Sequence, residues 1–483
     1  MMAVMEFDTS KRWCYWFRRI SDIPRGSRNE KAVSDMVVQF AKDHGFSCHQ
    51  DDVWNVTVDK PASPGYEAAA PLVLQAHMDM VNARANDSSH DFEKDPLDLY
   101  VDEDGNLRAR GTTLGADDGV GVAYMLAILE DDSLAHPALE CIFTTMEEIG
   151  LVGAQQMKSS DVHGDRLICL DGGGETKTGL SSAGGADVNL DLDLVLEKNQ
   201  DAAYELKVGG LSGGHSGGEI HKEKGNADVL AVRILQEARE RGVDVRVVSI
   251  SGGSKDNAIP TDASIVFTSG ADEALIQKSL ELSVDAIHKE LEFSDPGFKA
   301  NIGPVEGVRE HADEKTSNAL LDYIYLMPNG FQHRSMAIEG LTLTSLNLGI
   351  AKTMGNHVHL QTLTRSALDT GVDDLLGKLK KLAEILGVNY SVSGRYPGWN
   401  FKKESPMRDK FAAVLAKRNE KLEVEAAHGG NECGVWSGLR PGIDIITFGP
   451  IASGCHTVQE KLDLSSFDRS YAILCEIMAL CKD

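Results

Sequence analysis

Four separated apolar runs in this chain each end in a residue type that binds metal ions. They are LVLQAH at 72–77, CIFTTMEE at 141–148, RLICLD at 166–171 and IITFGPIASGCH at 445–456. Runs of this length and composition predict buried strands. Because ligands bind at the carboxyl ends of strands in an open α/β sheet, the four ends are expected to meet at one edge. The chain is therefore expected to fold around a sheet with a polar cluster at that edge.

The residues at these ends form a donor set for metal ions. The strand ends supply His77, Glu148, Asp171 and His456, and the GADDGVG segment at 115–121 adds Asp117. Two imidazoles and three carboxylates suit two zinc ions that share one carboxylate, and cobalt or manganese would accept the same donors. We assign Asp117 as the shared carboxylate and leave Asp118 as a supporting or helix-capping group. The sequence thus indicates a dinuclear metallohydrolase.

Two further acidic residues adjoin these positions. Glu147 precedes Glu148 within TTMEEIGLVGA, whose apolar flanks argue against the alternative of a solvated loop. Metal-assisted hydrolysis needs a proton acceptor beside a metal ligand, so Glu147 is predicted to be the general base. Asp79 follows His77 by two residues and is expected to hydrogen bond the free imidazole nitrogen, which would fix the tautomer. The alternative for this HxD triplet is a pair of surface polar residues.

Composition excludes several kinds of partner. The 483 residues carry a formal net charge of −26 without a block of Lys and Arg, so nucleic acid and anionic membranes are not expected as partners. No apolar run has the length expected of a signal peptide or a transmembrane helix. The eight cysteines have no CxxC spacing and indicate a reducing, cytoplasmic location. Cys455 is predicted to pack in the interior, with a soft metal ligand as the alternative.

The pattern of apolar residues changes along the chain and predicts two kinds of domain. Residues 1–186 and 400–483 alternate helices with apolar strands, as in an α/β fold whose mostly parallel sheet is covered on both faces. Residues 187–399 instead contain strands in which polar and apolar residues alternate, together with amphipathic helices, which predicts an inserted α+β domain. Within it, the segments 246–301 and 341–393 each offer two strands, a helix and another strand, a pattern typical of an internal duplication.

The inserted domain also contains a glycine-rich loop, GGLSGGHSGGE at 209–219. A phosphate-binding loop is the alternative, but the GxxxxGK[ST] spacing and the strand-to-helix context of a dinucleotide site are both missing from this segment. By residue type alone, His215 in this loop is an ordinary loop histidine.

Seven motifs resemble, in order along the chain, the two-zinc exopeptidases, a family that includes aminoacylases, glutamate carboxypeptidases and dipeptidases. They are HMD at 77–79, GTTLGADDGVG at 111–121, MEEIGLVGA at 146–154, LDGGGE at 170–175, GGHSGG at 213–218, DNAIP at 256–260 and SGCHT at 453–457. Within that family the chain looks most like the aminoacyl-histidine dipeptidases, also called Xaa-His or β-alanyl-histidine dipeptidases. This closer resemblance rests on the sequence of residues 90–121 and on the long inserted domain.

The resemblance implies a di-zinc catalytic domain with an α+β lid and assigns roles to the metal ligands. His77 and Asp171 would each anchor one side of the metal pair, and Asp117 would bridge the two ions and precede a cis peptide bond. Glu148 and His456 would complete the two sides.

The resemblance also assigns roles to four residues of the region around the lid. His215 would stabilise the oxyanion of the tetrahedral intermediate. Asn257 of DNAIP and Arg365 of LTRSA would hold the substrate carboxylate, which an Arg side chain can bind through two hydrogen bonds. Gly430 of GGNECG would offer a backbone contact.

The implied activity is zinc-dependent hydrolysis of small dipeptides with C-terminal histidine, such as carnosine. In this hypothesis a hydroxide between the zinc ions attacks the peptide carbonyl after Glu147 has taken its proton, and Glu147 returns the proton to the leaving amine. An N-acyl amino acid deacylase and a dipeptidase of broader specificity are alternatives for the same site, and a non-catalytic metal-bound interaction protein is a more remote one. The oligomeric state is left open between a monomer and a homodimer. A duplicated lid would supply within one chain the contacts that relatives with a shorter lid obtain by dimerising.

Overall fold

The structure, a computed structural model, describes residues 7–483 and contains two compact units. The first unit comprises the described residues up to Ser181 together with Phe401–Ala426 and Asn431–Asp483. The second unit comprises Ser182–Asn400 and the short segment Ala427–Gly430, so it is inserted into the first. The strand Gly184–Asp193 begins before the expected domain boundary at 186, and a boundary there would cut it.

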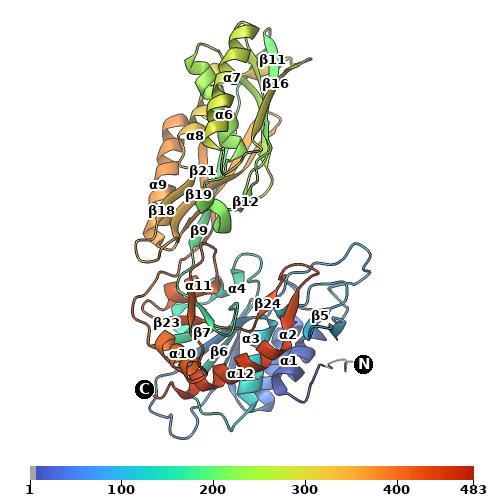
Figure 1. Cartoon of the computed structure of the whole chain (residues 1–483), viewed down its shortest axis with the longest axis vertical. Coiled ribbons are helices and arrows are strands. Elements are labelled where there is room, and N and C mark those ends of the chain that lie inside the picture. The colour runs from blue at the N-terminus through green and yellow to red at the C-terminus, as the bar shows by residue number, and fades with distance from the viewer. Residues whose placement is uncertain (1–6) are drawn as a thin grey trace. The chain divides into compact units, whose positions relative to one another are not determined.

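A six-stranded sheet forms the centre of the first unit (Figure 1). Its strands, in sheet order, are β1 (Ser47–Gln50), β2 (Val56–Lys60), β6 (Leu139–Thr144), β3 (Leu72–His77), β7 (Arg166–Cys169) and β23 (Asp444–Thr447). The last four run parallel, whereas β2 is antiparallel to both of its neighbours. The expected mostly parallel sheet is therefore mixed, because a short hairpin joins β1 to β2 and a short connection can only reverse the chain.

Helices lie on both faces of this sheet. One face packs against α1 (Arg12–Ser21), α2 (Lys31–Asp43), α3 (Ala116–Glu130), α10 (Pro406–Lys417) and α12 (Leu464–Ala479). On the other face lies α11 (Glu432–Leu439), which contacts α4 (Val152–Gln156) and reaches β3 through a hydrogen bond between Glu432 and Gln75. Every residue of β3 is buried, and α3 is apolar on all sides, as expected for elements in the middle of a core.

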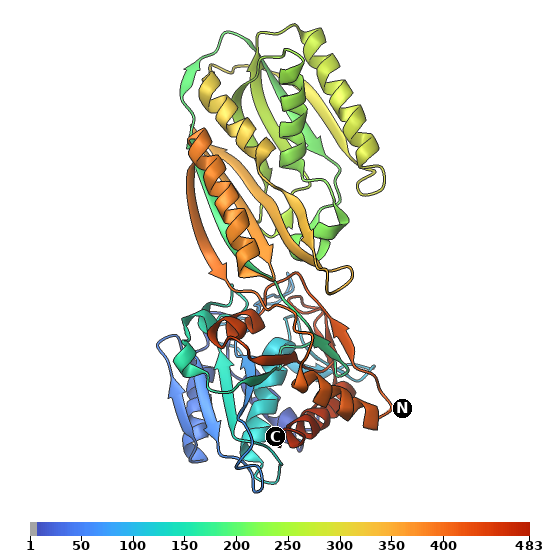
Figure 2. The same ribbon diagram turned by 90° about the vertical axis from the view of Figure 1, so that its left-hand side faces the viewer.

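The second unit is built on a nine-stranded antiparallel sheet. Its strands, in sheet order, are β16 (Lys299–Val305), β11 (Ala202–Gly209), β15 (Ala263–Ser269), β13 (Arg246–Gly253), β19 (Thr342–Met354), β20 (His357–Ser366), β9 (Gly184–Asp193) and β21 (Asn389–Tyr396), and β18 (Gly330–Arg334) pairs with β19. One face carries the long helices α6 (Ala227–Glu240), α7 (Glu273–Glu290), α8 (Glu314–Leu326) and α9 (Asp369–Leu386), which Figure 2 shows in front of the sheet.

Burial along β9 explains why this sheet forms. Ala186, Val188, Leu190 and Leu192 are buried in the core beneath the helices, whereas the residues between them are half-buried. Alternation with a period of two is what a sheet with one covered face requires. The antiparallel architecture expected from the sequence pattern is thus the one observed.

The two halves of the sheet in the second unit repeat one order of elements. In the first half β13 and β15 are followed by α7 and β16, and in the second half β19 and β20 are followed by α9 and β21. β11 lies between β15 and β16 in the sheet, as β9 lies between β20 and β21. The strand, strand, helix, strand pattern expected at 246–301 and 341–393 is therefore present.

The remaining elements are short. The first unit has a four-stranded sheet of β24 (Ala452–Ser453), β25 (Lys461–Asp463), β5 (Asn106–Ala109) and β4 (Leu99–Val101), a pair formed by β8 (Lys177–Gly179) and β22 (Glu423–Glu425), and a 3₁₀ turn at Ser159–Asp161. The second unit pairs β10 (Leu196–Lys198) with β17 (Glu310–Ala312) and β12 (Gly214–His215) with β14 (Ala258–Ile259), and continues from β12 into α5 (Ser216–Glu219) and a 3₁₀ turn at Ile220–Lys222. Between residues 7 and 483, no helix combines the length and the apolar character needed to span a bilayer.

Candidate metal centre

The parallel strands of the first unit bring four of the predicted ligands to one edge of the sheet. β3 ends at His77, β6 leads into the turn with Glu148, β7 is followed by Asp171, and β23 leads into the loop with His456. Because these strands are parallel, their carboxyl ends share one edge. The fifth ligand, Asp117, comes from the start of α3, which packs against β3.

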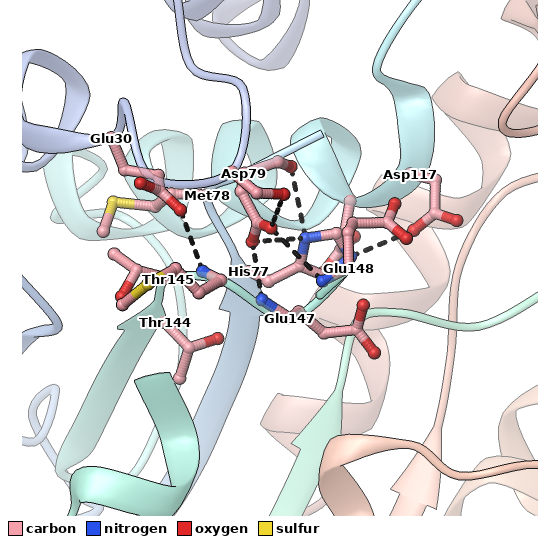
Figure 3. A network of polar contacts seen from close by, with 12 residues as sticks. Glu30, His77, Met78, Asp79, Asp117, Thr144, Thr145, Glu147 and Glu148 are labelled. Carbon is pink, nitrogen blue, oxygen red and sulfur yellow. Dashed lines mark hydrogen bonds and ion pairs between the residues drawn. The ribbon is translucent and has the colours of Figure 1, made fainter. Parts of the chain in front are cut away.

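Asp117 lies at the centre of this donor set. Its Oδ1 is 3.0 Å from Nε2 of His77, a contact that is drawn as a dashed line in Figure 3. Its Oδ2 is 3.2 Å from Nε2 of His456. The same nitrogen of His456 is 3.0 Å from Oε1 of Glu148. The peptide bond between Asp117 and Asp118 is cis, as the resemblance implies, and Oδ1 of Asp118 accepts a hydrogen bond from the N–H of Gly121 at 3.1 Å. Asp118 therefore has the capping role left open for it.

The candidate ligand atoms form three overlapping groups, two of which share Asp117. In the first, ligand atoms of His77, Asp117 and Asp171 lie within 4.8 Å of one another, and in the second those of Asp117, Glu148 and His456 do. In these groups His77 and Asp171 lie together, whereas the resemblance implies that each anchors one side of the metal pair. The physical reason is the sheet order: β3 and β7 are neighbours, so the residues at their ends lie side by side.

Asp79 connects His77 with the turn that carries the two glutamates (Figure 3). Its carboxylate accepts hydrogen bonds from the N–H groups of Glu147 at 3.0 Å and Glu148 at 3.2 Å, and from the hydroxyl of Ser27 at 2.7 Å. The expected contact between the Asp79 carboxylate and the imidazole is longer than these hydrogen bonds, with Oδ1 of Asp79 3.4 Å from Nδ1 of His77. The carbonyl oxygen of Asp79 lies 3.2 Å from the same nitrogen. Asp79 therefore positions the turn at least as directly as it positions the imidazole.

Glu147 belongs to the third group, together with His77 and Glu148. One of its carboxylate oxygens lies within 4.8 Å of ligand atoms of His77 and Glu148. Burial raises the pKa of Glu147 well above its ordinary value, the imidazole of His77 opposes that rise, and the carboxylates of Asp171, Glu432 and Glu148 add to it. A carboxyl group in such a setting takes up a proton more readily than an exposed one.

The remaining pKa shifts show how crowded the negative charge is. Burial, followed by the charge of Asp117, raises the pKa of Asp171 to about 7. Hydrogen bonds to Asp117 and Glu148 raise the pKa of His456 to about 10. For His77, burial opposes the charged form, but hydrogen bonds to Asp117 and Asp79 outweigh it and hold the pKa well above its ordinary value. The carboxylates thus draw protons toward the cluster.

The donor set fits two divalent cations. In the part of the chain from residue 7 to 483, the ion pairs of Asp79, Asp117 and Glu148 go only to His77 and His456. Metal ions would supply the positive charge that these carboxylates otherwise obtain from the imidazoles, and three carboxylates with two imidazoles match the oxygen and nitrogen donors of zinc.

The four residues predicted to contact substrate lie in the second unit and form two neighbourhoods there. His215 on β12 pairs with Ala258 on β14, and the carbonyl of Asn257 accepts a hydrogen bond from the N–H of Ser216 at 2.8 Å, so His215 and Asn257 are brought together. Burial lowers the pKa of His215, and the positive charge of Arg365 lowers it further.

Arg365 and Gly430 meet at the ring of Tyr396. Arg365, on β20, is 5% exposed, and its Nη1 donates a hydrogen bond to the hydroxyl of Tyr396 at 3.1 Å. Gly430 packs against the same ring so closely that an added Cβ would lie 2.6 Å from it. Within residues 7–483 the Nε of Arg365 has no hydrogen-bond partner. This buried guanidinium is therefore not fully hydrogen bonded by the described residues.

Several residues of these neighbourhoods were not predicted. Tyr396 lies in GRYPGWN, and His428 is a buried imidazole whose Nε2 is 2.7 Å from the hydroxyl of Ser345. Burial and the charge of Arg365 lower the pKa of His428 to about 3. Neither residue follows a buried strand or a glycine-rich turn, which were the signals used for the metal ligands.

Known proteins resemble this chain over nearly its whole length. The sequence pattern of peptidase family M20/M25/M40 matches residues 73–480. The cytosol non-specific dipeptidase of Escherichia coli (strain K12) is 34% identical over 469 residues, which cover 96% of each chain. The crystal structure of an aminoacylhistidine dipeptidase from Vibrio alginolyticus is 31% identical, with a TM-score of 0.89, and covers 97% of this chain and 96% of that one.

A more distant structure shares the fold alone. The aminopeptidase PepT from Bacillus cereus ATCC 10987 is 15% identical, with a TM-score of 0.56 and 98% of both chains covered. The family resemblance inferred from the seven motifs is confirmed by the family pattern and by the two nearer relatives. The chain, with its two ligand groups joined at Asp117, belongs to the peptidase family M20/M25/M40.

Proposed function

We propose that this protein is a zinc-dependent dipeptidase that hydrolyses dipeptides with a free C-terminus, with Xaa-His dipeptides such as carnosine among its substrates. The observation that carries the proposal is the position of Asp117, whose two carboxylate oxygens face two different imidazoles and belong to two ligand groups. The names of the two nearer relatives, a non-specific dipeptidase and an aminoacylhistidine dipeptidase, support the substrate class.

The two ligand groups would hold one cation each. His77 and Asp171 would bind the first, Glu148 and His456 the second, and Asp117 both. Zinc suits this mixture of imidazole and carboxylate, and cobalt or manganese accepts the same donors. When bound, the two ions would polarise the scissile carbonyl and make water a nucleophile at neutral pH.

Glu147 would move the proton during hydrolysis. In the proposal its carboxylate takes a proton from the attacking water and returns it to the amine of the departing residue. Support comes from its place beside both His77 and Glu148, and from the hydrogen bond by which Asp79 holds its backbone. Since Asp79 also holds the backbone of Glu148, it would keep the general base and a ligand at a constant separation.

Four residues of the second unit would recognise the substrate. Arg365 would bind the C-terminal carboxylate, because its guanidinium is buried and is not fully hydrogen bonded within residues 7–483. Asn257 would assist it, Gly430 would contribute a backbone contact, and His215 would donate a hydrogen bond to the oxyanion. A requirement for a free carboxylate would make the enzyme an exopeptidase.

Replacing Arg365 by Lys is expected to lower kcat/KM for a dipeptide by about 10- to 100-fold, mainly through a higher KM. A Lys side chain keeps the positive charge but cannot make the paired hydrogen bonds of a guanidinium, and a charge-assisted hydrogen bond contributes about 1.5–3 kcal/mol. The measurement compares dipeptide acid with dipeptide amide on both proteins. Both should cleave the amide equally slowly, and a variant that still prefers the acid as strongly as the wild type would contradict the role of Arg365. Arg395→Lys, at an exposed surface ion pair with Asp373, is the control.

The substrate assignment is tested with three compounds on the zinc-loaded enzyme: carnosine, a dipeptide without histidine, and an N-acetyl amino acid. Cleavage of carnosine at a rate at least equal to that of the other dipeptide supports the Xaa-His assignment. Faster cleavage of the dipeptide without histidine favours the broader specificity that the name of the Escherichia coli relative suggests. Preference for the N-acetyl amino acid would contradict the proposal and indicate a deacylase.

A further inference from the structure

Two buried charged side chains lie beside the segments that carry the metal ligands, although neither belongs to a ligand group. Arg25 is 2% exposed and Glu460 is 3% exposed. Both direct their charged atoms at backbone groups of these segments. Buried charges are costly unless they are fully hydrogen bonded, so their position here requires an explanation.

Arg25 joins the segment of His77 to the segment of Asp117. Its Nη1 donates hydrogen bonds to the carbonyl oxygens of Met78 at 3.0 Å and Asp79 at 3.1 Å, and its Nη2 donates to the carbonyl oxygen of Gly115. One rigid, planar guanidinium therefore binds the chain directly after His77 and two residues before Asp117. A guanidinium is suited to this link, because its donors are held in a constant geometry.

Two glycines of the GADDGVG motif make room for this guanidinium. A Cβ on Gly115 would lie 2.5 Å from Nη2 of Arg25, and a Cβ on Gly119 would lie 2.6 Å from the same atom. Gly115 also has a φ of 66°, a value that favours glycine. Gly115 and Gly119 are thus explained by Arg25 and, for Gly115, also by the local turn.

Glu460 joins the segment of Asp117 to the segment of His456. Its Oε2 accepts hydrogen bonds from the N–H groups of Leu114 at 2.7 Å and Gly115 at 3.0 Å. Its Oε1 accepts from the N–H groups of Ala116 at 2.8 Å and Asp117 at 3.4 Å. Glu460 follows His456 by four residues, so one carboxylate binds the backbone of the bridging aspartate to the loop of a ligand in the second group.

We infer that Arg25 and Glu460 are positioning residues that set the spacing of His77, Asp117 and His456, and thereby the affinity for the two metal ions. The inference rests on the metal assignment of the proposed function and concerns residues that bind neither metal nor substrate. Arg25 links the backbone next to His77 with the backbone next to Asp117. Glu460 links the loop of His456 with the backbone next to Asp117. Removal of such outer hydrogen-bond partners typically costs 10- to 100-fold in metal affinity.

The test measures zinc affinity of Glu460→Gln by competition with a chelating dye. Glutamine has nearly the shape of glutamate, but its amide presents one acceptor oxygen and an NH₂ group to four backbone donors. We expect zinc affinity to fall by about 10- to 100-fold in the folded variant. Arg25→Lys is the second variant, since a Lys ammonium lacks the planar geometry that reaches three carbonyl oxygens, and it should weaken zinc binding in the same direction.

The matched control is Glu140→Gln. Glu140 is also a buried glutamate of the first unit, is 3% exposed, and accepts hydrogen bonds from the N–H groups of His163 and Gly164. It lies near the start of β6, whereas the ligands follow the ends of the strands. This variant is expected to lower the melting temperature and to leave zinc affinity unchanged.

The outcomes separate this inference from the proposed function. If Glu460→Gln lowers the melting temperature like Glu140→Gln but binds zinc as tightly as the wild type, Glu460 serves only the fold and the inference is overturned. Failure of both Glu460→Gln and Arg25→Lys to fold would overturn it as well. A wild-type protein that binds no zinc would instead refute the metal assignment itself.

Discussion

Replacing Glu147 by Gln is expected to lower kcat for dipeptide hydrolysis by about 10²- to 10⁴-fold while both zinc ions stay bound. Glu147 would act on protons, and it belongs to neither of the two groups that share Asp117. The amide of glutamine cannot accept a proton, but it keeps the size of the side chain and the backbone hydrogen bond to Asp79. The measurement combines steady-state kinetics with the zinc content of the same dialysed sample.

The matched control for this prediction is Glu148→Gln at the adjacent position. Its backbone is held by the same carboxylate of Asp79, but its side chain belongs to the second ligand group. Glu148→Gln should therefore lose zinc as well as activity. If Glu147→Gln retains more than a tenth of the wild-type kcat, or loses zinc as Glu148→Gln does, its role as general base is wrong.

Replacing Asp117 by Asn is expected to abolish measurable hydrolysis and to reduce the zinc content from two ions per chain to one or fewer. Asp117 belongs both to the group with His77 and Asp171 and to the group with Glu148 and His456. Each of its carboxylate oxygens faces a separate imidazole. An amide offers a single acceptor oxygen and no negative charge, so it cannot complete both groups. Zinc content after dialysis, measured beside carnosine hydrolysis, checks the prediction.

Asp118→Asn is the control for this variant. Asp118 is buried next to Asp117, caps the N–H of Gly121 through Oδ1 and belongs to no ligand group, and asparagine keeps that acceptor. Asp118→Asn should bind two zinc ions. Two zinc ions in Asp117→Asn would show that Asp117 does not bridge the pair.

The candidate metal ligands could be predicted from the sequence because each follows a local pattern of residues. His77 ends a strand whose residues are all buried, and such strands can be recognised in a sequence as apolar runs. Asp171 and Glu148 follow similar strands, so their meeting at one edge follows from parallel topology. The alternation of polar and apolar residues along β9 likewise allowed the antiparallel sheet of the second unit to be predicted.

Other features depend on contacts between distant segments, which no local pattern contains. The closeness of Asp171 to His77 depends on the pairing of β7 with β3. Arg25 and Glu460 bind backbone atoms far away in sequence, and a backbone group has no residue type by which to identify its partner. The hairpin that makes the first sheet mixed depends on pairing as well.

The most direct test of the central claim is to measure zinc content and carnosine hydrolysis on one purified sample, before chelation, after chelation and after zinc is restored. A dinuclear dipeptidase should contain about two zinc ions per chain, lose activity as they are removed and regain it as they return. Hydrolysis that persists in the metal-free protein would contradict the account. Two bound ions without cleavage of any dipeptide would also contradict it.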